Sequence, residues 1–143
     1  MEKCIDANVA LKWVIKGEPH RRRALKLLKD AIQSGVILIA PPMYEYETES
    51  VLQGRIVYKQ SSMQDIDAAL VSLEKSGVQL ISMPSLVKRA REIARKYNQP
   101  QIYDSLYAAL AELRGCEFWT ADKKFYDAVK GGLSFVKYLA HYK

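Results

Sequence analysis

The stretch that decides the fold is Lys3-Cys4-Ile5-Asp6-Ala7-Asn8, near the start of the chain. Cys4 and Ile5 are typical of the end of a short buried strand, and the apolar spacing after them predicts a helix that Asn8 can cap. Asp6 is therefore expected where a strand gives way to a helix, the place where open α/β sheets bind their ligands. Taken alone, the stretch is more simply explained by a carboxylate that caps the helix or closes a turn.

The length and composition fit a single domain over residues 1–143. Apolar residues make up 49% of the chain and charged residues 27%, which is ordinary for a globular domain. No apolar run is long enough for a membrane span or an N-terminal signal, so we expect a cytoplasmic protein. Cys4 and Cys116 lie in apolar stretches without a Cys-x-x-Cys or Cys/His cluster, which predicts reduced core residues rather than a disulfide or a zinc site.

The net charge of +6 suggests a polyanionic partner, although many basic proteins bind none. The basic residues gather on two predicted helices, one beginning at Glu18-Pro19 and one after Pro84. They are Arg21, Arg22, Arg23 and Lys26 on the first, and Lys88, Arg89, Arg91, Arg95 and Lys96 on the outer face of the second. Such runs are usually solvated faces, but they could also meet nucleic-acid phosphates or an acidic peptide.

Alternating strand and helix patterns predict an α/β fold. Besides the first strand, apolar runs predict strands at 36–40, 78–83 and 134–139, and one from Gly115 that ends near Thr120, just before Asp122. Helical spacing at 43–52 and 63–76 predicts a pair of helices that form a hairpin. From Leu106 to Leu113 the residues are small or apolar almost all round, which predicts a central helix.

Three glutamates stand within five positions of the helix that begins at Met43. Glu45 and Glu49 are four residues apart and share one face, whereas Glu47 falls on the face that also holds Met43 and Ser50. A carboxylate over an apolar face is costly unless it is paired or binds a cation. Glu47 is therefore the functional candidate of the three, and Glu45 and Glu49 are expected to be surface groups.

Two further acids occupy distinctive places. Asp104 lies in the first turn of the apolar helix, where the helix dipole favours a carboxylate, so plain capping explains it acceptably. Asp122 follows a predicted strand that ends near Thr120, and so repeats the situation of Asp6.

These four acids occur in motifs that resemble those of PIN-domain ribonucleases, particularly the VapC toxin type. The motifs are Ile-Asp-Ala-Asn-Val-Ala-Leu-Lys-Trp around Asp6, Ala-Pro-Pro-Met-Tyr-Glu-Tyr-Glu-Thr-Glu around Glu47, Tyr-Asp-Ser-Leu-Tyr-Ala-Ala-Leu around Asp104 and Trp-Thr-Ala-Asp-Lys-Lys-Phe around Asp122. The match covers nearly the whole chain. The resemblance implies a PIN-like three-layer sandwich with a central, mostly parallel five-stranded sheet. It also implies that the four acids meet at the carboxyl edge, with Asn8 and Thr120 as polar support.

Converging carboxylates suit a hard divalent cation, so the implied cofactor is Mg²⁺ or Mn²⁺. Such an ion acidifies a bound water and neutralises phosphate charge, which allows phosphodiester hydrolysis without a side-chain nucleophile. His20 and His141 lack partners for a histidine mechanism, and no GxxxxGK phosphate loop occurs.

Together with this chemistry, the resemblance implies a metal-dependent endoribonuclease, the toxin of a toxin–antitoxin pair, with RNA as substrate and a small antitoxin as partner. Exposed apolar helix faces and the resemblance favour a homodimer. Two alternatives stay open: a PIN-like RNA- or protein-binding module without catalysis, and a metal-dependent phosphohydrolase of small phosphate esters.

Overall fold

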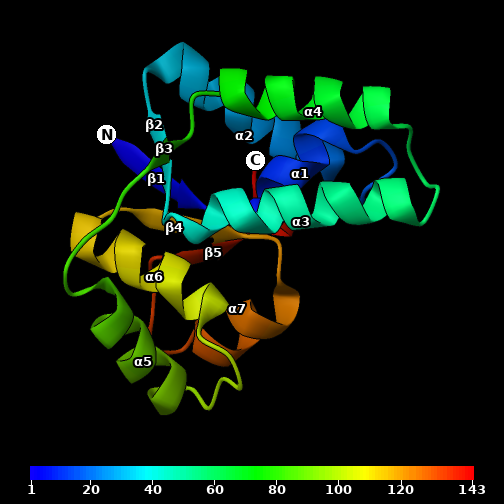
Figure 1. Ribbon diagram of the computed structural model, residues 1–143. Helices are drawn as coiled ribbons and strands as arrows, with labels where there is room; N and C mark the ends of the chain where they lie inside the picture. The colour runs from blue at the N-terminus through cyan, green and yellow to red at the C-terminus, as the bar shows by residue number, and fades with distance from the viewer.

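Five parallel strands form the centre of the computed structural model, which describes residues 1–143 (Figure 1). The sheet order is β3-β2-β1-β4-β5, and every neighbouring pair is parallel. The strands are β1 (Glu2–Ile5), β2 (Ile37–Ala40), β3 (Gln79–Leu80), β4 (Glu117–Thr120) and β5 (Val136–Tyr138). The predicted sheet is confirmed, and it is parallel throughout rather than mostly parallel. The strand that leads into Asp6 is its middle member.

Helices cover both faces of this sheet, which makes three layers (Figure 1). One layer contains α1 (Ala7–Val14), α2 (Arg21–Ser34) and α4 (Met63–Lys75), and α3 (Met43–Val57) packs against α1 and α4. The other contains α5 (Leu86–Lys96), α6 (Tyr103–Arg114) and α7 (Lys123–Val129). A short 3-10 helix, Leu139–His141, ends the fold and contacts α2. The antiparallel pair α3 and α4 is the predicted hairpin.

The central helix predicted from the apolar pattern is α6. Its residues Tyr107 to Ala111 are all buried, and α6 packs on both β1 and β4. Runs of alanine allow a helix to approach a sheet closely, because no long side chain stands between the two backbones. This packing fixes the first turn of α6 close to the carboxyl ends of the two middle strands.

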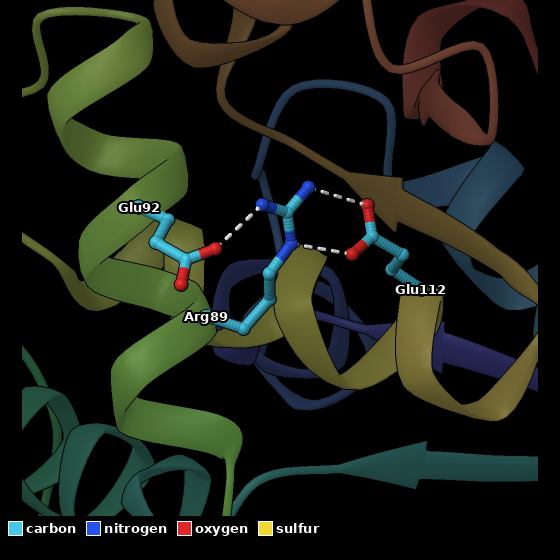
Figure 2. Close-up of polar contacts among 3 residues, drawn as sticks. All are labelled: Arg89, Glu92 and Glu112. Atoms are coloured by element: carbon cyan, nitrogen blue, oxygen red, sulfur yellow. Dashed lines mark hydrogen bonds and ion pairs between the residues drawn. The ribbon is translucent and has the colours of Figure 1, made fainter.

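Arg89 departs from the prediction that it faces out with the other basic residues of α5. It is half-buried, and its guanidinium joins α5 to α6 through both carboxylate oxygens of Glu112 (Figure 2). The Nε–Oε1 distance is 2.5 Å and the Nη2–Oε2 distance is 2.9 Å, while Nη1 donates to Glu92 at 3.0 Å. The planar fork of arginine matches a carboxylate in this way, and a lysine cannot. Helical periodicity alone does not reveal such a partner on another helix.

Two predicted helix starts are also wrong. Asn8 does not cap α1, because the N-cap is Asp6, whose side chain accepts from the backbone N–H of Val9; Asn8 is exposed within the helix. The second helix does not begin at Glu18-Pro19 but at Arg21, after His20 in a left-handed conformation. Asp6 is itself a favourable N-cap residue, in agreement with the simpler explanation of its stretch, whereas His20 makes no side-chain cap and turns the chain just before the second helix begins.

The third strand is shorter than the predicted 78–83. Only Gln79 and Leu80 pair, on the outer edge of the sheet, and both are exposed. The predicted cysteine state agrees with the structure, since Cys4 is buried, Cys116 is half-buried and both thiols are free. None of the helices combines the length and the apolar character that crossing a bilayer requires.

Candidate active site

Asp6 lies at the carboxyl end of the middle strand and is 3% exposed. Its Oδ1 accepts from the Val9 backbone N–H at 2.9 Å, and its Oδ2 accepts from Thr120 Oγ1 at 2.7 Å and from the Ala121 backbone N–H at 3.1 Å. Burial raises the pKa of Asp6 to about 6, against the opposing effect of these hydrogen bonds. Asp6 is thus a buried acid held between α1 and the end of β4.

Asp122 stands two residues beyond β4. Its backbone N–H donates to Thr120 Oγ1 at 3.0 Å, and its Oδ1 accepts from the Phe125 backbone N–H at 3.0 Å as the N-cap of α7. The Thr120 hydroxyl, which is fully buried, therefore connects Asp122 to Asp6. This connection places both strand-end acids at one edge of the sheet.

Glu47 reaches the same edge from α3. It is half-buried, whereas Glu45 and Glu49 are exposed. Its Oε1 accepts from the hydroxyl of Tyr107 at 2.6 Å, and burial raises its pKa. The predicted inner face of α3 was wrong in part, because the buried residues are Tyr44, Thr48 and Leu52, and Ser50 is exposed. The buried face of α3 is shifted by one residue from the predicted face, so Glu47 lies at the edge of the buried face rather than at its centre.

Asp104 is the least compensated of the four acids. It lies in the first turn of α6, half-buried, and accepts no hydrogen bond from any backbone N–H, hydroxyl or basic group. Burial raises its pKa well above the ordinary range, and the charges of Asp6, Asp122 and Glu47 add to the effect, as does a hydrogen bond between the Asp104 and Asp122 carboxyls. Its electrostatic neighbours are thus the three other predicted acids.

Cations do not neutralise this group of acids. None of the eight ion pairs in the structure includes Asp6, Glu47, Asp104 or Asp122. Carboxylates that lie close together without a counter-ion raise the free energy of the folded state in their ionised forms. The arrangement therefore favours binding of a cation or of protons.

The donor chemistry of the four acids fits a hard divalent cation. Glu47 Oε2 accepts no protein hydrogen bond, Asp122 accepts one from a backbone N–H besides its contact with the Asp104 carboxyl, and Asp104 contacts no donor other than Asp122. Oxygen atoms of this kind are the ligands that Mg²⁺ and Mn²⁺ prefer. The structure contains no group of three or more histidine, cysteine, aspartate or glutamate side chains arranged closely enough to hold a metal ion.

The supporting residues predicted from the sequence differ in placement. Thr120 contacts Asp6 and Asp122, whereas Asn8 is exposed on α1 and makes no hydrogen bond with the acids. Sequence reasoning missed Tyr107 and the backbone N–H of Ala121. A usable signal existed for Tyr107, which stands three residues after Asp104 and so shares its helix face.

The chain belongs to the PIN-domain family, whose family model matches residues 3–131. PIN domains are nucleases, that is, hydrolases of phosphodiester bonds. The resemblance inferred from the four acidic motifs is confirmed at the level of this family.

Two solved structures share the fold. PAE2754 from Pyrobaculum aerophilum aligns over 98% of this chain and 92% of its own, with a TM-score of 0.67 and 19% identity. VapC20 from Mycobacterium tuberculosis, described as a sarcin-ricin loop cleaving toxin, aligns over 92% of this chain and 95% of its own, with a TM-score of 0.62 and 14% identity. At these identities the likeness concerns the fold. No curated protein matches the chain significantly in sequence.

Proposed function

We propose that this PIN domain is a metal-dependent endoribonuclease that cleaves RNA phosphodiester bonds and acts as the toxin of a toxin–antitoxin pair. The observation that carries the proposal is the gathering of Asp6, Glu47, Asp104 and Asp122 at one sheet edge without a basic partner. A structural ion-pair network would have included lysine or arginine. In a site that binds a divalent cation, by contrast, the acids have no basic side chain as partner.

The four acids have distinct parts in this proposal. The ion would be bound mainly by carboxylate oxygens of Asp104, Glu47 and Asp122. The carboxylate of Asp6 accepts three hydrogen bonds and is held in a fixed orientation beside them. When bound, Mg²⁺ or Mn²⁺ supplies charge neutralisation of the phosphate and a more acidic water. Asp104, which accepts no hydrogen bond from a backbone N–H, a hydroxyl or a basic group, is the carboxylate whose oxygens the protein leaves most available to the ion.

The exposed basic residues of α5 support RNA over a small phosphate ester. Lys88, Arg91, Arg95 and Lys96 are exposed and make no ion pair, in contrast to Arg89. Free cations on one helix offer contacts to several successive phosphates, which a long substrate has and a small ester does not.

The toxin assignment rests on the resemblance to VapC-type proteins and on the fold shared with VapC20, a sarcin-ricin loop cleaving toxin. An apolar groove of about 770 Å³ between α1, α2 and α4 offers room for an antitoxin segment. Its lining includes Trp13, Leu25, Leu28, Ile66 and Ala69, and Ile32 at its rim is 68% exposed. We place the protein in the cytoplasm, with its RNA substrate, and propose a homodimer.

The deciding experiment is incubation of the purified protein with total RNA, with Mg²⁺, with Mn²⁺ and with a chelator. We expect cleavage with either metal, none with the chelator, and none for Asp104→Asn. A parallel assay with a small phosphodiester such as bis(p-nitrophenyl) phosphate tests the second alternative. Hydrolysis of the ester with intact RNA would assign a phosphohydrolase, and RNA binding without cleavage would assign a binding module.

A further inference from the structure

Glu47 is held by a contact that links three parts of the site. The Tyr107 hydroxyl donates to Glu47 Oε1 at 2.6 Å, across 60 residues of sequence. The backbone N–H of Ala7, next to Asp6, faces the same hydroxyl oxygen. The hydroxyl of Tyr107, a residue of α6, therefore contacts Glu47 on α3 and lies beside the junction of β1 and α1.

The position of this hydroxyl is fixed by packing. Tyr107 is 1% exposed, and its ring is stacked on Phe118 of β4 with the centroids 5.7 Å apart and the planes at 9°. Phe118 in turn packs on Phe125 of α7. A ring held between a helix and a sheet has no alternative rotamer, so its oxygen is a fixed point beside the acids.

The contact also leaves the two oxygens of the Glu47 carboxylate in different states. Oε1 is occupied by the phenol, and Oε2 accepts no protein hydrogen bond. A glutamate on its own has three rotatable bonds, and ordering it around an ion costs side-chain entropy. The phenol removes part of this cost before any ion arrives.

We propose that Tyr107 is a positioning residue that presents Glu47 to the divalent cation and thereby sets the affinity of the site for metal. The proposal rests on the proposed metal-dependent function. Outer hydrogen bonds to metal ligands typically contribute 10- to 100-fold to affinity. Because Tyr107 stands one turn after Asp104 on α6, one helix supplies a proposed ligand and the support of a second ligand on α3.

The test is a Mn²⁺ titration of the full chain, without RNA, in which free Mn²⁺ is followed by electron paramagnetic resonance. Tyr107→Phe removes only the hydroxyl and keeps the ring stacked on Phe118. We expect it to weaken Mn²⁺ binding by about 10-fold or more. Tyr44→Phe is the matched control, since Tyr44 is a tyrosine on α3 that is 7% exposed and whose buried hydroxyl has no partner; its Mn²⁺ affinity should equal that of wild type.

A double-mutant cycle with Glu47→Ala separates positioning from a general structural role. If Tyr107 acts through Glu47, Tyr107→Phe will change Mn²⁺ affinity no further once Glu47 is truncated. Equal Mn²⁺ affinity of Tyr107→Phe and wild type, with or without a lower melting temperature under chelation, overturns the inference and leaves the metal site standing. If wild type binds no more Mn²⁺ than Asp104→Asn, the metal site itself is refuted, and the inference with it.

Discussion

The hydroxyl of Thr120 donates to Oδ2 of Asp6 at 2.7 Å, across 114 residues of sequence. This bond joins the ends of two neighbouring parallel strands, and the same oxygen accepts the backbone N–H of Asp122. Both strand-end acids are therefore oriented by one buried side chain.

Replacing Thr120 by valine should uncouple the two acids. Thr120→Val keeps the shape but leaves Asp6 without its hydroxyl donor and the Asp122 N–H without its acceptor, and a lost bond to a buried charged group costs about 1–3 kcal/mol. Urea unfolding at pH 7 measures the loss. Thr120→Ser keeps the hydroxyl and should retain most of the stability; equal loss in both variants would assign the effect to the methyl group instead.

Cleavage of RNA should require the acids gathered at the sheet edge and not their exposed neighbours. Asp104→Asn and Glu47→Gln each remove an anionic ligand with little change of shape, and we expect a loss of about 100-fold or more in rate, since such a ligand supports several kcal/mol of charge stabilisation. Asp6→Asn and Asp122→Asn should also abolish cleavage. Glu45→Gln and Glu49→Gln are the controls, and inactivity of Glu45→Gln would move the site to the other face of α3.

Without metal, the stability of the protein should fall as pH rises from 5 to 8. The pKa values of Asp6, Glu47 and Asp104 are raised in the folded state, so the folded protein holds these protons more tightly than the unfolded chain. This contribution is complete below about pH 4 and is lost as pH passes through the folded-state values. For Asp6, from 3.8 to about 6, it amounts to ~3 kcal/mol.

Thermal melts in a chelator at several pH values measure this dependence. The carboxyls of Glu2, Asp30 and Asp127 have lowered pKa values and titrate below this window. Asp104→Asn should flatten the slope between pH 6 and 8. A melting temperature that rises with pH over this range would show that the acids are satisfied by protein groups.

Metal should stabilise wild type more than it stabilises Asp104→Asn. Under chelation the variant should melt at the same or a higher temperature than wild type, because it relieves repulsion among the acids, less ~0.3–1 kcal/mol of lost dipole interaction in the first turn of α6. Saturating Mg²⁺ then raises the wild-type melting temperature by binding linkage. A strongly destabilised variant, with neither protein responding to Mg²⁺, would contradict the metal site.

The bidentate pair between Arg89 and Glu112 should tie α5 to α6. Arg89→Lys keeps the charge but loses the fork, so we expect a loss of up to about 1 kcal/mol in the free energy of unfolding. Arg91→Lys on the exposed face of α5 is the control and should have no effect. Equal values for the two variants would show that packing alone holds the two helices together.

The order of elements was predictable because strand and helix periods differ sharply in this chain. The apolar runs around Ile39 and Phe118 and the alanine-rich helix after Asp104 fixed the α/β class. The carboxyl ends of parallel strands share one edge, which made Asp6 and Asp122 candidates for one site.

Features that depend on distant partners were not predictable in the same way. The fork of Arg89, the contact of Tyr107 with Glu47 and the bond of Thr120 to Asp6 each involve the geometry of a second element. The inner face of α3 was displaced by one residue from the prediction because α3 packs on α1 and α4 rather than on the sheet. Local periodicity does not specify which elements a helix packs against.

The sheet order has a consequence for biosynthesis. β1 is made first, yet one of its two neighbours, β4, is among the last strands to be made. A nascent chain of 100 residues therefore carries Asp6 and Glu47 but neither Asp104 nor the Thr120 hydroxyl that orients Asp6. The four acids cannot be gathered before Asp122, which follows β4, has been synthesised, so the order of translation makes assembly of the site a late event relative to the folding of β1 with β2.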